Sequence, residues 1–338
     1  MTSAHIGRKP LDLKRTVSIL FSLTLLLVAV CIFGLSVGSV DIPFAAILPS
    51  LFGDVSVDQS VRTIVVDIRL PRLFLAMLVG ASLSISGAVF QALLRNPLAE
   101  PYILGISSGG TVGAILAIGL GLGFSAFTTP FASFLGSALV MLLVYTIAHR
   151  RGQLDTNTLL LAGVMIGAFF NAAVLLIIAL FNQELRNSFL WLMGNLSNAN
   201  MESLAVVTPL VVVGSAILLM QSRKYNLIAT GDETAIQLGV DVRHIKRLSY
   251  ILASLITGVV VSVSGVIGFV GLIIPHMCRM MFGPDHRLLM PASILLGGSF
   301  MIVADVISRT LLAPTEIPVG AVTAAIGAPL FVYLLKRT

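Results

Sequence analysis

Long apolar stretches dominate the chain, and short polar segments separate them. A helix that crosses the hydrocarbon core of a bilayer needs about 20 predominantly apolar residues. Most of the stretches have about this length, so the pattern predicts an all-α polytopic membrane protein. The nine stretches cover residues 17–37, 70–94, 102–122, 127–148, 158–181, 204–221, 248–282, 288–307 and 317–335.

The seventh stretch is too long for a single span. Its 35 residues would form a helix of about 52 Å at 1.5 Å per residue, whereas the hydrocarbon core is about 30 Å thick. The stretch also contains Gly265, Gly268, Gly271 and Pro275, residues that bend or break helices. We therefore predict two helices here and about ten transmembrane helices in all.

The basic residues predict the orientation of the spans, because lysine and arginine favour the cytoplasmic side. Both ends of the chain are basic, so both termini are expected to be cytoplasmic, which requires an even number of spans. With ten spans, ten basic residues in loops and six at the ends, 16 of the 21, fall on the cytoplasmic side. Those at the ends are Arg8, Lys9, Lys14, Arg15, Lys336 and Arg337; those in loops are Arg95, Arg150, Arg151, Arg223, Lys224, Arg243, Lys246, Arg247, Arg279 and Arg287; the outer ones are Arg62, Arg69, Arg72, Arg186 and Arg309.

Composition narrows the class of protein further. Of the residues, 57% are hydrophobic and 11% charged, and the mean hydropathy is +1.02, whereas soluble domains carry about 25% charged residues. This excludes a soluble enzyme and a disordered protein. The net charge of +6 does not indicate nucleic acid, since the basic residues lie in short clusters between spans. We expect one membrane domain over residues 1–338, with a cytoplasmic tail at 1–16 and a cytoplasmic loop at 223–247.

Arginines on the outer side are the first candidate functional feature. Arg69 and Arg72 flank Leu70-Pro71 just before the second span, and we interpret them as a stiff basic knob that docks an acidic partner. Arg309 lies four residues after Asp305 at the outer end of the ninth span. The alternative is structural: these arginines snorkel to the interface, or Arg309 pairs with Asp305 within the helix.

Three cytoplasmic segments are further candidates. In the 223–247 loop, Asp232 and Glu233 follow Gly231 as at a helix start, which predicts a short helix, either interfacial or presented to a partner. The segment Arg95–Pro101 contains two prolines and predicts a rigid turn. Thr156-Asn157 precedes the fifth span and is interpreted as a helix cap.

The sequence lacks the motifs that are typical of several kinds of functional site. The sequence contains no G-x-x-x-x-G-K-[ST] loop for ATP and no H-E-x-x-H metal motif, and its five histidines do not cluster at ligand spacing. Gly105-Ile-Ser-Ser-Gly109 matches G-x-S-x-G, but it opens an apolar helix rather than a strand–helix turn. An intramembrane enzyme is therefore disfavoured. An ion-coupled secondary transporter stays open, because residues 265–275 could form a broken helix.

Motifs from about residue 65 to the end resemble one known family, the ABC-type importer permeases for iron–siderophore complexes, haem or cobalamin. The resemblance implies ten helices per subunit, two copies around one path and no bond chemistry in this chain. The matching segments are 68–72, Gly80-Ala81, 86–88, 96–101, 104–107, 159–163, 237–239, 265–276, 285–287, 316–320 and 327–329.

The resemblance also implies roles for particular residues. Arg69, Arg72 and Arg309 match positions that pair with glutamates of an external substrate-binding protein. The 227–239 loop matches the helices that couple to the ATPase, with Asp232 where glutamate is common. The coupling residues are Gly231, Asp232, Glu233, Ala235, Gln237, Leu238 and Gly239, and the inner-gate residues are Asn96, Leu98, Thr156 and Asn157.

The resemblance further implies an importer that works by alternating access in a prokaryotic cytoplasmic (inner) membrane. Its expected partners are a second copy of this chain, two ATP-binding subunits, one external binding protein and the lipid bilayer. ATP and magnesium would bind to the ATPase, and no cofactor or metal to this chain. We expect an iron complex as cargo, either a ferric siderophore or haem, with cobalamin as the alternative.

Overall fold

The apolar stretches are helical in the computed structural model, which describes residues 12–38, 40, 42–54, 57–122, 127–150, 152–180, 189 and 191–336. Within these residues, seven helical segments are long and apolar enough to cross a membrane, and three further apolar helices are shorter. The long segments are α1 (Leu13–Ser36), the continuous helix α3 (Gln59–Thr63), η1 (Ile64–Arg69) and α4 (Leu70–Leu93), α6 (Thr128–Ala148), α7 (Thr156–Leu180), α9 (Met201–Met220), α12 (Val242–Ser264) and α14 (His286–Thr310); the shorter ones are α5 (Ile106–Gly119), α13 (Val270–Phe282) and α15 (Val319–Leu335).

The all-helical membrane fold is confirmed, whereas the count of ten spans needs the three shorter helices to cross as well and stays a prediction. Some boundaries differ from the apolar stretches. The second span continues back to Gln59, and α12 begins at Val242 rather than at 248. α5 starts late because η2 (Pro101–Leu104) is a 3-10 turn that ends at Gly105, whose φ is +74°. Five of the basic residues used for orientation, Arg8, Lys9, Arg151, Arg186 and Arg337, lie outside the described residues.

The predicted break in the 248–282 stretch is confirmed. α12 ends at Ser264 and α13 begins at Val270, and the connection contains Gly265 at φ +68° and Phe269 at φ +70°. A segment from the other half of the chain satisfies its freed backbone groups. The Tyr102 hydroxyl accepts a hydrogen bond from the Ile267 N–H at 3.0 Å, and Glu100 accepts one from the Phe269 N–H. Such compensation is what permits irregular backbone within a membrane protein.

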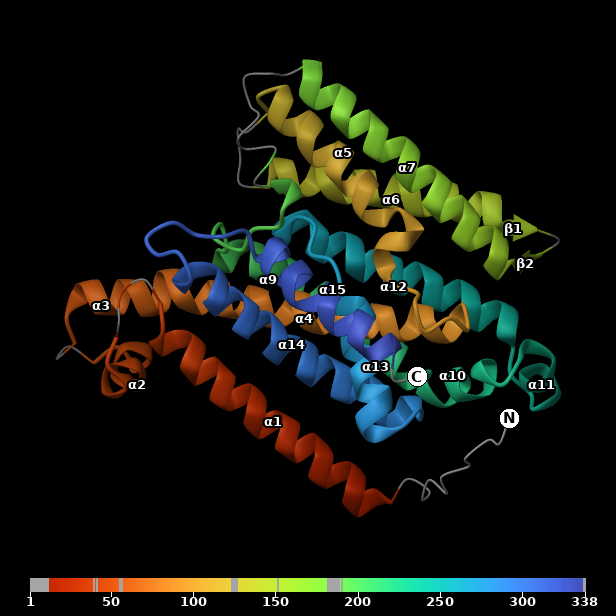
Figure 1. Cartoon of the computed structure of the whole chain (residues 1–338), viewed down its shortest axis with the longest axis horizontal. Helices are drawn as coiled ribbons and strands as arrows, with labels where there is room; N and C mark the ends of the chain where they lie inside the picture. The colour runs from red at the N-terminus through yellow and green to blue at the C-terminus, as the bar shows by residue number, and fades with distance from the viewer. Residues whose placement is uncertain are drawn as a thin grey trace.

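The two ends of the bundle carry different short elements (Figure 1). One end carries α2 (Phe44–Phe52) and α3, and we call it the outer end. The other carries α10 (Ser222–Ala229) and α11 (Asp232–Gln237), and we call it the inner end. The start of α1 and the end of α15 lie toward the inner end, the arrangement that an even number of crossings produces. These names follow the predicted orientation.

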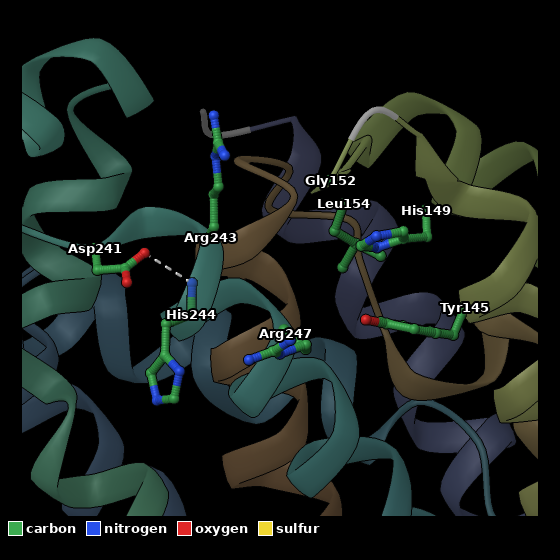
Figure 2. A pocket seen from close by; sticks show the side chains of 8 residues that line it. All are labelled: Tyr145, His149, Gly152, Leu154, Asp241, Arg243, His244 and Arg247. Carbon is green, nitrogen blue, oxygen red and sulfur yellow. Dashed lines mark hydrogen bonds between the residues drawn. The ribbon is translucent and has the colours of Figure 1, made fainter.

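A small hairpin joins α6 to α7 at the inner end. Its strands β1 (His149–Arg150) and β2 (Gln153–Leu154) pair antiparallel, and the Asp155 carboxylate caps α7 by accepting a hydrogen bond from the Thr158 N–H at 2.6 Å. Thr156 is already the first helical residue, so the prediction that Thr156-Asn157 is the cap is wrong by one position. β2 packs against α12, and the hairpin faces the first turn of α12 across a pocket (Figure 2).

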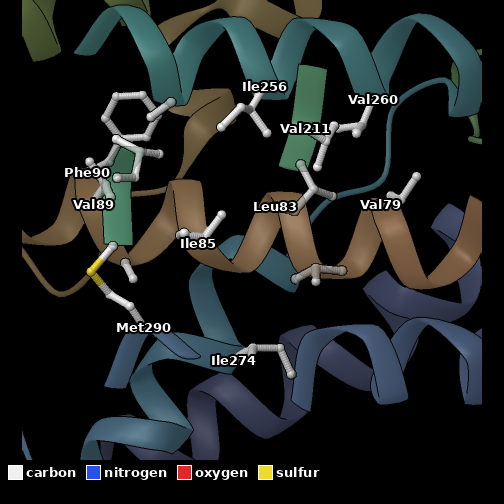
Figure 3. Packing of buried hydrophobic residues seen from close by; sticks show 14 of the residues in the cluster. Val79, Leu83, Ile85, Val89, Phe90, Val211, Ile256, Val260, Ile274 and Met290 are labelled. Atoms are coloured by element: carbon white, nitrogen blue, oxygen red, sulfur yellow. The ribbon is translucent and has the colours of Figure 1, made fainter. Parts of the chain in front are cut away.

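Helix α4 lies at the centre of the bundle and is largely buried. It packs against α9, α12, α13 and α14, and apolar side chains from all five helices interlock around it (Figure 3). Small residues allow this approach, as expected where lipid provides no hydrophobic drive between helices. A Cβ atom on Gly87 would lie only 1.9 Å from the Gly271 carbonyl oxygen of α13. The core members drawn and labelled are Val79, Leu83, Ile85, Val89, Phe90, Val211, Ile256, Val260, Ile274 and Met290.

Candidate functional site

The three predicted docking arginines come together at the outer end, but their side chains point into the protein. Arg69, Arg72 and Arg309 are only 4%, 6% and 8% exposed. Arg69 is the last residue of η1, which runs without interruption into α4. The interpretation of Arg69 and Arg72 as a stiff basic knob is therefore wrong, because both side chains are buried, whereas their role in docking stays a prediction. The segment is continuous helix, and its guanidinium groups are turned toward α1, α14 and the connection before α15.

Asp305 is the shared partner of two of these arginines. The Arg72 Nε donates to Asp305 Oδ1 at 2.8 Å, and the Arg309 Nε lies 3.3 Å from Asp305 Oδ2. The predicted pairing of Asp305 with Arg309 within one helix is thus present. A second carboxylate completes the set, because a terminal Arg72 nitrogen lies 2.9 Å from both oxygens of Glu316. The side chain of Glu316 is 45% exposed, so it covers the solvent side of a buried guanidinium.

The other two guanidinium groups hold the end of α1. Arg69 donates to the carbonyl oxygens of Leu35 and Ser36 at 2.6 and 2.7 Å, and to that of Val40. Arg309 donates to the Gly34 carbonyl oxygen at 2.5 Å. The last carbonyls of a helix lack intrahelical partners and carry the negative end of its dipole. Positive side chains at this position therefore anchor α1 to α4 and α14.

At the inner end, α11 begins where the sequence predicts, at Asp232 after Gly231. Ile236 in the helix and Leu238 directly after it are exposed, whereas Ala235 is buried against the bundle. Of the other predicted coupling residues, Glu233, Gln237 and Gly239 are also exposed. The short helix therefore presents a mixed apolar and polar face away from the bundle.

Ion pairs fasten this helix to two spans. The Lys246 ammonium, which is buried on α12, donates to Asp232 Oδ2 at 2.5 Å. On the opposite side, a terminal nitrogen of Arg95, just after α4, lies 3.8 Å from Asp232 Oδ1. Among the described residues, Asp232 is thus the one carboxylate that links α11 both to α12 and to the segment just after α4. Displacement of α11 would pull on both helices through this residue.

The neighbouring helix α10 is fastened to the start of α14. The Asn226 Nδ2 donates to Asp285 Oδ1 at 2.8 Å, and the Asn226 Oδ1 accepts from the His286 backbone N–H at 2.8 Å. Arg287 donates to the same carboxylate at 2.6 Å. Burial alone would raise the pKa of Asp285, but the hydrogen bonds from Arg287 and Asn226 outweigh it and lower this pKa to about 2. Asp285 therefore stays ionised and caps α14.

The predicted inner-gate residues lie on two separate segments near the inner end. Asn96 forms the expected turn after α4, with its Oδ1 accepting from the Leu98 N–H at 2.9 Å, and Leu98 is exposed. Thr156 and Asn157 begin α7, and Asn157 is exposed. Within the part of the chain that the structure describes, no hydrogen bond joins the two segments. Their role in a gate stays a prediction.

Comparison with known proteins identifies the family. The model of the FecCD transport family matches residues 25–337, nearly the whole chain. The protein belongs to the FecCD transport family. A cobalamin import system permease of Halobacterium salinarum is 45% identical over 303 residues, which is 90% of this chain and 80% of that protein. A hemin transport system permease of Yersinia pestis is 38% identical over 320 residues, covering 93% and 94% of the two chains.

A solved structure supports the same assignment. It is titled as an inward-facing conformation of a metal-chelate type ABC transporter, and it matches with a TM-score of 0.85 and 33% identity over 95% of this chain and 100% of that one. The FecCD chain described here is thus a multi-pass membrane protein of the class of ABC importer permeases for iron chelates, haem and cobalamin. Its relatives are named as transport permeases, not as enzymes.

The internal partners of the candidate residues in this FecCD chain have no signal in the local sequence. From the sequence, Lys246 is only an orienting charge, Arg95 is an orienting charge at the start of a predicted turn, and Glu316 is part of a matching motif. Lys246 follows Asp232 by 14 positions, and Glu316 follows Arg72 by 244, so neither pair has a local spacing signal. One signal was available: Asp305 is an acidic residue inside an apolar stretch, and such residues require a partner.

Proposed function

We propose that this chain is the membrane-spanning permease subunit of an ATP-driven importer, which moves a metal-containing cargo into the cell by alternating access. In the proposed assembly, two copies line one path, two ATP-binding subunits lie at the inner end, and an external substrate-binding protein docks at the outer end. The membrane is a prokaryotic cytoplasmic membrane. Energy comes from the ATP-binding subunits, because the sequence carries no phosphate-binding loop.

The observation that carries this proposal is the attachment of α11, in a chain that belongs to a family of importer permeases. The helix exposes Ile236, and Leu238 directly after it, at the inner end. Asp232 ties the helix to Lys246 of α12 and to Arg95 just after α4. A helix with an exposed apolar side fits a groove on a partner. Movement of that partner would reach the central helix α4 directly.

The proposed docking of an external protein involves Arg69, Arg72 and Arg309. Their burial supports a specific form of docking: a partner carboxylate would approach Arg72 from the side of Glu316, whose side chain is 45% exposed. Such a carboxylate would take the place of Glu316, whose two oxygens both contact one terminal nitrogen of Arg72. Arg69 and Arg309 would then act by holding α1 and the outer ends of α4 and α14 in position.

For the cargo, we propose an iron complex, either a ferric siderophore or haem, and the relative named for hemin transport supports haem. Cobalamin is a second candidate, because the relative named for cobalamin import is 45% identical against 38% for the hemin relative. The ion-coupled carrier is the remaining alternative. It differs from the importer in needing no ATP-binding partner.

The test is gentle extraction from the native membrane, followed by identification of the co-purifying proteins. We expect an ATP-binding subunit, with an external binding protein when cargo is present. Proteoliposomes of the purified complex then receive ATP and radiolabelled cobalamin, haem or a ferric hydroxamate in turn. Uptake of one cargo that requires ATP supports the proposal. Uptake by the chain alone, driven by an ion gradient, would overturn it.

A further inference from the structure

The inner end contains a basic pocket that the proposed transport cycle does not use. Its volume is about 240 Å³, whereas a cavity that holds one water molecule needs roughly 10–15 Å³ in the same measure. Four elements line it: the end of α6, the hairpin strands β1 and β2, and the start of α12 (Figure 2). The lining residues are Tyr145, His149, Gly152, Leu154, Asp241, Arg243, His244 and Arg247.

The pocket has more positive than negative charge. Arg243 and Arg247 lie four residues apart on one face of α12, and within the described residues neither forms an ion pair with an acidic side chain. Among the described lining residues, Asp241 is the one carboxylate, and it is engaged at the helix start, where its Oδ1 accepts a hydrogen bond from the His244 N–H at 3.0 Å. In Figure 2, Arg247 occupies the middle of the pocket, with Tyr145 and His149 on one side and His244 on the other.

This donor set suits a phosphate group. Guanidinium groups bind phosphate oxygens through paired N–H donors, and imidazole and phenol groups add further donors. The first turn of α12 adds the positive end of a helix dipole. A ligand that brought a phosphate here would supply the anion that Arg243 and Arg247 lack, and it would bridge the hairpin to α12.

The surface that leads to the pocket indicates where the phosphate comes from. On α6, Leu135, Leu139 and Leu142 are each about half exposed. Their spacing of four and three residues places them on one face of the helix, and Tyr145 follows Leu142 by three positions beside that face. Tyrosine is enriched at the level of lipid headgroups, and basic pockets between spans on the cytoplasmic side bind anionic headgroups. We propose that this pocket binds the phosphate headgroup of an anionic phospholipid of the inner leaflet, whose acyl chains lie along α6.

The experiment is native mass spectrometry of the delipidated full-length chain, titrated separately with phosphatidylglycerol, phosphatidylcholine and inorganic phosphate. We expect one phosphatidylglycerol molecule to bind more tightly than the others. The double variant Arg243→Gln/Arg247→Gln should weaken this binding by about thirtyfold, since each basic residue near a membrane surface contributes about fivefold. If the pocket instead binds free phosphate from solution, inorganic phosphate should bind as tightly as phosphatidylglycerol, and that result would overturn the lipid assignment.

The matched control is Arg223→Gln/Lys224→Gln, which removes two positive charges from exposed positions of α10 at the same end. This control should keep the affinity of the unchanged chain. Equal losses of affinity in both double variants would show that net charge alone determines lipid binding, and would refute the pocket as the binding site. Should the Arg243/Arg247 double variant fail to fold by circular dichroism, Arg247→Gln alone tests the proposal, with an expected loss of about fivefold. Unchanged binding in that variant would also refute it.

Discussion

Arg72 and Asp305 are 233 positions apart in the chain, yet the Arg72 Nε and Asp305 Oδ1 lie 2.8 Å apart at the buried outer end of the bundle. The pair joins α4, the central helix, to α14. Arg309 contacts the same carboxylate, so one aspartate balances two guanidinium groups. We therefore expect substitution of Asp305 to destabilise the fold most within this cluster, because Arg72 and Arg309 would stay buried without the carboxylate that they share.

The first prediction concerns this aspartate. Asp305→Asn should lower the free energy of unfolding by about 3–5 kcal/mol, the usual cost of breaking a buried ion pair on one side. Thermal unfolding of the purified protein in detergent measures the change. Glu316→Gln is the control, because its carboxylate is 45% exposed, and it should cost about 1 kcal/mol or less. Equal losses in the two variants would contradict the central role of Asp305.

The second prediction concerns the contact between α4 and α13. Gly87→Ala would bring a methyl group within 1.9 Å of the Gly271 carbonyl oxygen, so the two helices would have to separate. We expect a loss of about 1–3 kcal/mol, typical of overpacked cores, measured by thermal unfolding. Gly268→Ala is the matched control, because nothing lies within 4 Å of the added atom. A larger loss in the control than in Gly87→Ala would refute the packing argument.

The third prediction concerns the attachment of α11. Asp232→Asn removes the anion that Lys246 and Arg95 share. The amide hydrogens of α11 should therefore exchange about tenfold faster or more, because hydrogen bonds to charged groups contribute about 1.5–3 kcal/mol. Hydrogen exchange with mass spectrometry measures this in the isolated permease.

The control for α11 is Glu233→Gln, which removes the neighbouring, exposed charge and should leave exchange unchanged. If the proposed function holds, Asp232→Asn should also reduce permease-stimulated ATP hydrolysis in the full complex. Normal exchange in Asp232→Asn would show that the ion pairs do not hold the helix.

The fourth prediction is a pH dependence at the start of α14. The pKa of Asp285 is lowered to about 2 in the folded protein, against about 3.9 for an ordinary aspartate. A lowered carboxyl pKa stabilises the folded state above the ordinary value, and this contribution is lost as the pH falls toward about 2. Asp285→Asn should therefore be less stable than the unchanged chain at pH 7, and the difference should shrink between about pH 4 and 2. A difference that is independent of pH would contradict the assignment, and Glu202→Gln, at an exposed position, serves as the control.

Much of the architecture follows from local sequence patterns. The apolar stretches marked the helices, because a span needs an uninterrupted apolar segment of known length. The glycines after Ser264 marked the break between α12 and α13, and Gly231-Asp232 marked the start of α11. These features depend on neighbours within a few residues, so a single sequence contains the information that determines them.

The tertiary structure alone decided what each charged side chain contacts. By sequence, Arg69 and Arg72 precede an apolar stretch and resemble surface residues; in the folded chain they meet the end of α1, Asp305 and Glu316. The same holds for Lys246 and Asp232. A membrane helix can turn any of its faces toward a neighbour, and its partners come from distant parts of the chain. The sequence by itself therefore determined where helices form, and the packing of those helices decided which charges are buried together.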